Sequence, residues 1–206
     1  MKPEPKPVPP TDRTLYRLDG KLLDPFALRP EDCTLDEIAW RLARRYRYAA
    51  AAPYTVAEHS IALAFATKRR APAALKLQRA ALLHDAAEAF LGDIPAPLKA
   101  GLTWVAPNSQ THTYAQAEAA ARAAIEQRFR LRPRPGTYLV LALLETLLAR
   151  EERVFFFGGA TVGDRAAIEQ RLDPYGIRRG ASPPTDETIR DIFVAHAITL
   201  GLDDGE

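Results

Sequence analysis

The sequence contains a single cysteine, Cys33, among its 206 residues. One cysteine excludes an intrachain disulfide and a cysteine-rich zinc site, so metal chemistry would have to use histidine, aspartate and glutamate. Cys33 has no histidine near it in the sequence, which argues against a thiol nucleophile. Apolar runs of the roughly 20 residues that span a bilayer are also missing, and the N-terminus lacks the pattern of a signal peptide. We therefore expect a cytoplasmic protein with no membrane partner.

An excess of charge of either sign is missing as well. The 28 basic and 26 acidic residues leave a formal net charge of +2. This balance differs from the strongly basic one that is typical of nucleic-acid-binding proteins, so we expect no stable nucleic-acid partner. The length and the 47% of hydrophobic residues are typical of a globular domain with a sizeable core.

Proline is concentrated at the N-terminus, where it accounts for five of the first ten residues. Residues 1–12 are therefore predicted to form a flexible tail, and residues 13–206 a single domain. Two short apolar runs flank Asp19-Gly20, a dipeptide that favours a hairpin turn. After Pro30 the alanine and leucine residues follow helical spacing. The prediction is an all-α fold with a small N-terminal β-hairpin.

Two stretches fit the capping box at a helix start, Thr34-Leu35-Asp36-Glu37 and Thr55-Val56-Ala57-Glu58. Helices are predicted near residues 56–69, 73–91, 114–130, 137–157, 164–172 and 185–200. Residues 101–113 and 174–184 are rich in polar residues, glycine or proline and are predicted to be surface loops.

The chemistry centres on His59, in the first turn of one predicted helix, and on the doublet His84-Asp85 in the next. In a continuous helix His84 and Glu88 share one face, and Asp85 lies about 100° away. Apolar residues on both sides of the doublet indicate that it faces inward, where an unpaired carboxylate is costly and needs a cation. The alternative is a hydrogen-bonded His-Asp pair at a helix surface.

Two segments together resemble the HD-domain metal-dependent phosphohydrolases. They are Tyr54-Thr55-Val56-Ala57-Glu58-His59-Ser60 and Ala81-Leu82-Leu83-His84-Asp85-Ala86-Ala87-Glu88-Ala89-Phe90-Leu91-Gly92-Asp93-Ile94-Pro95. The likeness is strongest to the small HD proteins that include bacterial 5'-deoxynucleotidases and phage dATP triphosphohydrolases. It extends from about Leu15 to Phe156 and implies the HD-domain helical fold.

The resemblance implies a divalent metal ion (Co, Mn, Zn, Fe or Mg) held by His59, His84, Asp85 and Glu145. The last ligand of the family is usually Asp, followed seven residues later by Glu, whereas this chain has Glu145 and Glu152. The residues around Glu145 support a buried role, because it is the one charge in the apolar run 138–148 and needs a partner. The alternatives are a salt bridge to an arginine such as Arg150 and a position at the rim of the site.

Catalytic roles are implied for Glu88 and Asp93, which match the family positions that handle protons and the attacking water. The alternatives are that Glu88 supports a ligating histidine and that Asp93 caps the Ile94-Pro95 turn.

Substrate-binding roles are implied for Arg45, Tyr46 and Lys99, which match phosphate-contacting and pocket positions of relatives. The arginines around Arg45 otherwise read as a solvated helix face. Trp40 could stack on a base, although core packing fits it better. His112 and His196 are predicted to be structural or exposed.

The implied substrate is a small-molecule nucleotide, a deoxynucleotide mono- or triphosphate, and we expect a homo-oligomer. Two other functions stay open: a non-catalytic nucleotide-binding HD module, and a hydrolase of a signalling nucleotide. The departure at Glu145 keeps the first of these open.

Overall fold

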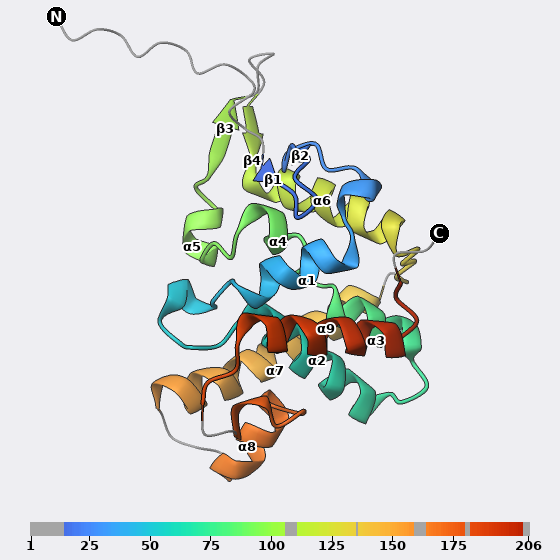
Figure 1. The fold of residues 1–206 in the computed structure, drawn as a ribbon. Coiled ribbons are helices and arrows are strands. Elements are labelled where there is room, and N and C mark those ends of the chain that lie inside the picture. The colour runs from blue at the N-terminus through green and yellow to red at the C-terminus, as the bar shows by residue number, and fades with distance from the viewer. Residues whose placement is uncertain (1–14, 106–110, 135, 159–163, 180–181, 204–206) are drawn as a thin grey trace, which may run out of the picture.

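The computed structural model describes residues 15–105, 111–134, 136–158, 164–179 and 182–203. The predicted tail at residues 1–12 lies outside these ranges. The described chain is mostly helical, as predicted (Figure 1). Its α-helices are α1 (Leu35–Ala43), α2 (Val56–Arg70), α3 (Leu75–Leu82), α4 (Glu88–Leu91), α5 (Ala96–Lys99), α6 (Tyr114–Arg128), α7 (Thr137–Phe157), α8 (Arg165–Leu172) and α9 (Asp186–Thr199).

The predicted N-terminal hairpin is present. Strand β1 (Leu15–Tyr16) pairs antiparallel with β2 (Leu22–Leu23), and Gly20 in the turn has a φ of +79°. A positive φ is accessible to glycine at little cost, which explains the Asp-Gly signal in the sequence.

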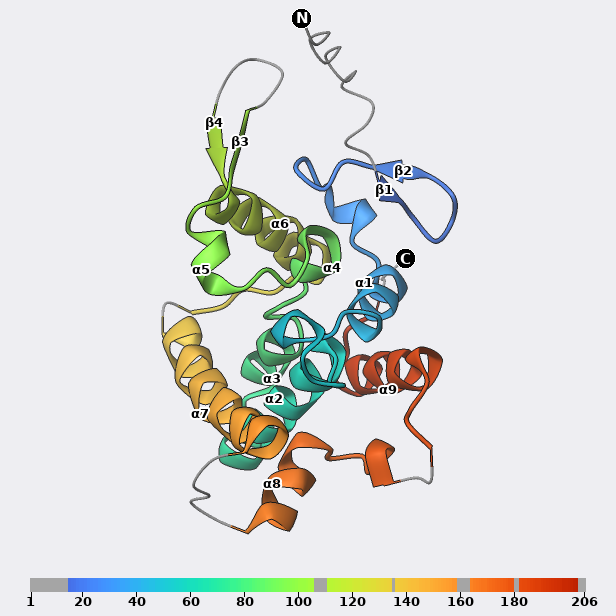
Figure 2. The same ribbon diagram turned by 90° about the vertical axis from the view of Figure 1, so that its left-hand side faces the viewer.

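Helix α2 is the central element of the helical bundle. It packs against α1, α3, α7, α8 and α9, and Figure 2 shows α2 and α3 between α7 on one side and α9 on the other. Ala57, Ala62 and Ala64 of α2 are fully buried, and such small side chains allow neighbouring helices to approach closely. The site residues that α2 carries are therefore surrounded by structure on several sides.

The caps of α1 and α2 differ from each other. At α2 the predicted capping box is complete, with Thr55 and Glu58 each bonding the backbone N–H of the other. At α1 the Thr34 hydroxyl accepts from the Glu37 N–H, but the Glu37 carboxylate accepts from Leu18 N–H instead. The second half of that predicted box was wrong because a tertiary partner, the N-terminal hairpin, takes the carboxylate.

Two predicted elements are wrong. The single helix expected at 73–91 is divided into α3 and α4, with a turn over residues 83–87. The surface loop expected at 101–113 contains a second antiparallel hairpin, of β3 (Thr103–Val105) and β4 (Thr111–Thr113). Threonine, tryptophan and valine favour strands. The prediction missed this preference because it relied on the polar residues of the same stretch, which are typical of loops.

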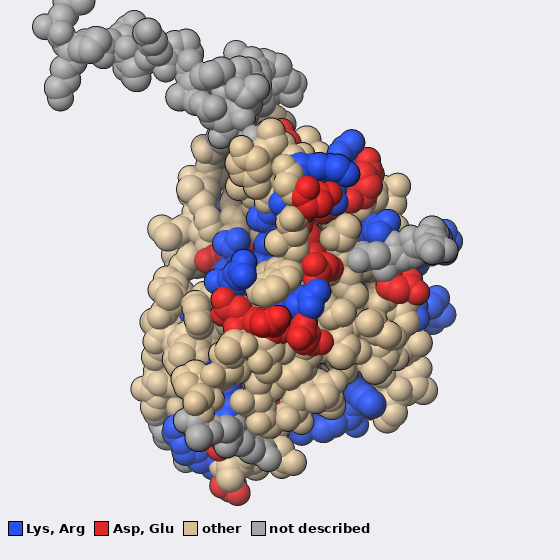
Figure 3. All heavy atoms as spheres, in the orientation of Figure 1, with Lys and Arg blue, Asp and Glu red and all other residues tan. Residues whose placement is uncertain are grey.

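None of the helices in the described ranges has the length and apolar character that crossing a bilayer requires. Figure 3 shows acidic and basic side chains next to one another on the face seen in Figure 1. Ion pairs such as Arg190 with Asp36 join α9 to α1.

Candidate metal centre and its surroundings

His59 is held at the start of α2 with one ring nitrogen engaged and the other unpaired. The capping box of Thr55 and Glu58 fixes the first helical turn, and the His59 side chain is fully buried. Its Nδ1 is hydrogen-bonded to the Glu152 carboxylate of α7. A carboxylate can only accept, so Nδ1 carries a proton, and in the neutral ring Nε2 is then the nitrogen with a lone pair. The buried Nε2 has no hydrogen-bond partner among the described residues.

His84 shows the same arrangement on a different backbone. It lies in the turn after α3, where Ala86 N–H bonds Leu83 C=O and Glu88 N–H bonds Asp85 C=O, an i to i+3 pattern. His84 Nδ1 donates to the Ala81 carbonyl at 2.8 Å. This side-chain bond occupies a carbonyl near the end of α3 and helps to end the helix there. His84 and Glu88 therefore do not share a helical face, contrary to the prediction.

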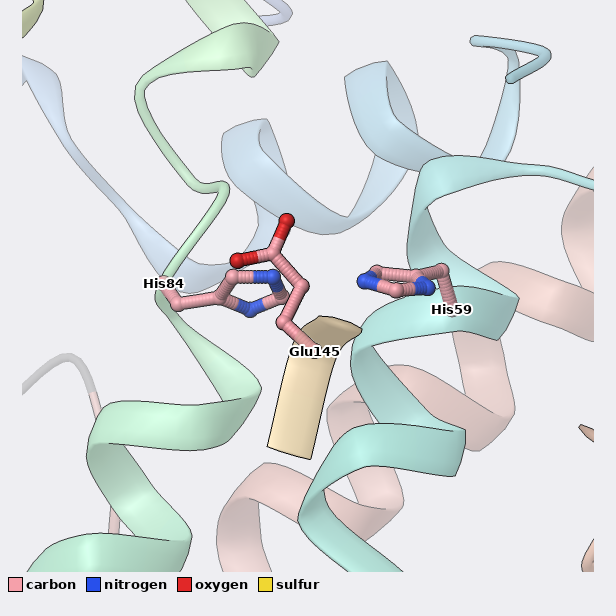
Figure 4. A group of neighbouring side chains, drawn as sticks. All are labelled: His59, His84 and Glu145. Carbon is pink, nitrogen blue, oxygen red and sulfur yellow. The ribbon is translucent and has the colours of Figure 1, made fainter. Parts of the chain in front are cut away.

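The two histidines face a third potential ligand. His59, His84 and Glu145 each offer an atom within 4.8 Å of the other two, so these three residues could hold a metal ion. Figure 4 shows the side chains converging from α2, from the turn after α3 and from α7. Within the described ranges Glu145 forms no ion pair with Arg150 or with another cation. The salt-bridge alternative for Glu145 is therefore not seen.

Asp85 lies beside the same two nitrogens. Its Oδ2 is 3.0 Å from His84 Nε2 and 3.9 Å from His59 Nε2, and Arg47 NH1 approaches the same oxygen at 3.5 Å. Burial alone would raise the pKa of Asp85, but His84, His59 and Arg47 lower it well below its usual range. Asp85 is thus an ionised carboxylate paired with His84. The His-Asp pair predicted as the alternative is therefore present, although both side chains are largely covered.

Arg47 and Tyr48 support the centre from the segment between α1 and α2. Arg47 Nε donates to Glu152 Oε2 at 3.2 Å, and the Tyr48 hydroxyl donates to the same oxygen at 2.7 Å. Burial would raise the pKa of Glu152, but His59 and Arg47 lower it to about 2. Glu152 is therefore an anion with its oxygens fully used, and it orients His59 rather than facing solvent.

Sequence reasoning did not assign a site role to Arg47, Tyr48 or Glu152. Glu152 was visible as the residue seven positions after Glu145, which is two helical turns and therefore the same face of α7. Arg47 and Tyr48 carried no comparable signal. Their contacts depend on how the segment before α2 folds, which spacing does not reveal.

Glu88 and Asp93 lie next to the centre on α4 and just beyond it. Glu88 Oε1 accepts from Lys99 Nζ at 3.2 Å, while the buried Oε2 has no hydrogen-bond partner in the described part of the chain. Burial, with Asp85 and Asp93 nearby, raises the pKa of Glu88 to about 8. Burial also raises the pKa of Asp93, against the effect of Arg47. Among the described residues, Glu88 forms no hydrogen bond to a histidine, so the predicted supporting role is not seen. Asp93 likewise accepts no hydrogen bond from a backbone N–H of the following turn, so the predicted cap is not seen.

Lys99 is engaged with carboxylates on both sides. Its ammonium donates to Glu118 at 2.6 Å as well as to Glu88. Burial lowers the pKa of Lys99, but these two carboxylates raise it above its usual value. Lys99 therefore lies near the proposed catalytic carboxylate, but a phosphate would have to share it with Glu88 and Glu118.

Arg45 connects the metal centre with a separate pocket. Its NH2 donates to the Ala89 carbonyl at 3.4 Å, and its buried Nε has no partner among the described residues. Burial lowers the pKa of Arg45, against the opposite effect of Glu88. Arg45 NH1 passes 3.1 Å from the place of a Cβ on Gly92, whose φ is +95°. Glycine at that position therefore permits both the turn before Asp93 and the close approach of the guanidinium.

The pocket beside Arg45 has a volume of about 630 Å³ and is lined by aromatic and basic side chains. Tyr46 is 44% exposed at its wall. Trp40 also lines it, with the Arg44 guanidinium 4.2 Å above its ring. Trp40 is therefore not simply a core residue. Aromatic faces beside guanidinium groups suit a ligand with a flat ring and an anionic group.

Of the other histidines, His196 is buried in α9, with the Tyr175 hydroxyl at 2.8 Å from its Nδ1, and His112 lies in β4.

Comparison of the sequence with protein-family models and with curated proteins found no match to either.

Proposed function

We propose that the chain is an HD-type metal-dependent phosphohydrolase whose substrate is a deoxynucleotide mono- or triphosphate. One observation carries the proposal: two histidines each engage Nδ1 elsewhere and direct Nε2 toward the carboxylates of Glu145 and Asp85, and the buried Nε2 of His59 has no hydrogen-bond partner among the described residues. An unpaired buried nitrogen is costly unless something binds it. The chemistry that fits imidazole nitrogens and carboxylate oxygens together is coordination of a divalent cation.

The proposed ligands are His59, His84 and Glu145, with Asp85 as the fourth. Two nitrogen donors favour Mn, Fe, Co or Zn over Mg, which prefers oxygen and water. A divalent ion at this position would polarise a phosphoryl oxygen and lower the pKa of a bound water.

The proton chemistry is assigned to Glu88 and Asp93. A carboxyl with a pKa of about 8 is protonated at neutral pH, so Glu88 can donate a proton to a leaving oxygen. Asp93 has a raised pKa and no hydrogen-bond partner in the described residues, which suits a group that accepts a proton from water.

Substrate binding is assigned to Arg45, Tyr46 and Lys99. Arg45 lies between the metal centre and the pocket, so its guanidinium can bind a phosphate while the nucleoside occupies the pocket. Tyr46 offers an exposed ring on which a base can stack. Lys99 would reach the phosphate while keeping Glu88 in place.

A non-catalytic nucleotide-binding module is the second candidate. The observation in its favour is the occupation of Lys99 by two carboxylates, which weakens its contribution to phosphate binding. The metal ion and the pocket beside Arg45 would then bind a nucleotide without hydrolysing it.

The test combines metal analysis with a hydrolysis panel. Purified protein is titrated with Mn, Co and Zn, and deoxynucleoside mono- and triphosphates are assayed with product identification. We expect about one ion per chain, released phosphate or triphosphate, and loss of both in His84→Ala. His112→Ala is the matched control and should keep both. Metal binding without hydrolysis of any nucleotide would select the non-catalytic module, and an absence of metal binding would end both proposals.

A further inference from the structure

Four arginines alternate with other residues where α6 ends: Arg128, Arg130, Arg132 and Arg134. Phe129 between them is buried, and Leu131 packs against the core. The apolar members of the alternation face inward, so Arg130, Arg132 and Arg134 are exposed. The function proposed above does not use this segment.

Arg130 occupies a backbone position that usually belongs to glycine. Its φ is +50°. Leu131 N–H donates to Glu126 C=O at 2.8 Å and Arg130 N–H to Gln127 C=O, which is the Schellman pattern at a helix end. A left-handed conformation is unfavourable for a residue with a side chain. The helix-end motif holds Arg130 in this conformation and fixes where its side chain starts.

A pocket of about 90 Å³ lies beside Arg130, between α3, α6 and the start of α7. Five cationic side chains line it: Lys76, Arg79, Arg122, Arg130 and Arg132. In the described part of the chain, none of these five forms an ion pair with a carboxylate.

The acidic residue of this pocket is Glu126, whose carboxylate accepts from the Tyr138 hydroxyl. Five cations and one carboxylate leave a formal excess of four positive charges. Elsewhere in the molecule many arginines are paired with acids, as Arg47, Arg178 and Arg190 are. Within the described ranges, the positive charge that lines this pocket therefore exceeds the negative charge of Glu126, which interacts electrostatically with Arg122.

We propose that this pocket, the arginine pocket, binds a small polyphosphate group. A ligand with three or four negative charges balances the excess, and guanidinium groups bind phosphate oxygens in pairs of hydrogen bonds. The small volume suits a compact anion better than a nucleic-acid duplex, and the chain as a whole is close to neutral. The arginine pocket shares no lining residue with the Arg45–Tyr46 pocket. His84 lines it, so the arginine pocket adjoins the candidate metal centre from the side of α3 and α6.

The test is calorimetric titration of the full chain with inorganic pyrophosphate in the presence of a chelator, which removes binding through the metal centre. We expect one equivalent to bind. Arg130→Gln combined with Arg132→Gln should weaken the affinity at least about tenfold. Arg150→Gln combined with Arg153→Gln is the matched control, because both residues are exposed on α7 and the same charge is lost. The control should stay within about twofold of the wild type.

Arg130→Gly separates binding from folding. Glycine relieves the positive φ, so this variant should be at least as stable as the wild type and still bind pyrophosphate more weakly. Equal loss in the test and control pairs would show general electrostatic attraction and overturn the proposal. So would an absence of binding, or a single-stranded oligonucleotide that binds more tightly and displaces pyrophosphate. None of these results depends on whether the metal centre is catalytic.

Discussion

Glu152 and His59 lie 93 residues apart in the sequence and are hydrogen-bonded to each other in the interior. Both side chains are fully buried, and the second carboxylate oxygen is bound by Arg47 and Tyr48. The bond fixes the tautomer and the direction of His59, so that Nε2 faces His84 and Glu145. Glu152 therefore acts as a positioning residue for the candidate metal centre.

Glu152→Gln should weaken metal affinity by about 10- to 100-fold, because the amide cannot give His59 the same negative partner. Metal titration checks this, with Glu151→Gln as the control because Glu151 pairs with Arg171 away from the centre.

The same pair predicts a pH dependence of stability. The pKa of Glu152 is about 2 in the folded protein and near 4.5 when unfolded. Its contribution to the free energy of unfolding is therefore complete above pH 4.5 and is lost as the pH falls from 4.5 to 2. Urea unfolding across this range should give a shallower dependence for Glu152→Gln. If the free energy of unfolding depended on pH equally in the wild type and in Glu152→Gln, Glu152 would not be the source of this dependence.

Glu145→Gln should lower metal affinity about tenfold or more, since an anionic donor is lost at nearly constant shape. Glu145→Asp should keep much of the activity if the proposed function holds, because Asp is the usual ligand at this position in the HD family that the sequence resembles. Elemental analysis and titration of both variants are the measurement. If metal affinity were unchanged in Glu145→Gln, Glu145 would not be a ligand, and His59, His84 and Asp85 would be the only proposed ligands left.

Glu88→Gln should retain metal but lose about 100-fold or more in turnover, as expected for a general acid. The pKa of Glu88 is about 8, so wild-type turnover should fall as the pH rises through 8, when the proton is lost. The residual turnover of Glu88→Gln should not show this decrease with rising pH. Asp93→Ala should also keep metal and lose turnover. Rates within threefold of the wild type in both variants would assign the two carboxylates structural roles.

Tyr48, Ala49 and Ala50 have φ values of +57°, +52° and +63°. Ala50→Gly should therefore raise stability by about 0.5–1 kcal/mol, since relief of the left-handed strain exceeds the added entropy of the unfolded chain. Ala51 has an ordinary φ of −73°, so Ala51→Gly should cost about 0.5–1 kcal/mol. Both alanines are exposed, and the midpoints of thermal unfolding compare them directly. If both variants were less stable than the wild type, the proposal that Ala50 is strained by its positive φ would be wrong.

Helix positions could largely be predicted from the sequence, because caps and apolar spacing are local signals. The predicted range 137–157 coincides with α7, and the Thr55 box marks the start of α2. The break after Leu82 could not be predicted in this way. It coincides with a local bond from His84 to the Ala81 carbonyl, which competes with the helix, and with the approach of Asp85 to His59, which is a tertiary contact.

For the candidate site, the sequence indicated the ligating residue types and the inward direction of His84 and Glu145. It did not indicate that Lys99 would be engaged by Glu118, a residue of a different helix. Nor did it show that Arg47 would reach Asp85. Charged pairs between distant elements leave no periodic trace in a single sequence.

The first turn of α2 is joined to the far end of the chain. Arg178 donates to both oxygens of Glu58 at 2.6 and 2.7 Å, and the buried Tyr54 hydroxyl donates to the Leu172 carbonyl. His59 follows Glu58 directly. A shorter chain ending after α7 would keep His59, His84, Asp85 and Glu145, yet it would leave Glu58 as an uncompensated anion against the helix that carries His59. The segment after α7 thus supports the helix turn that carries His59, and its deletion should change the geometry of the candidate metal centre without removing any of its residues.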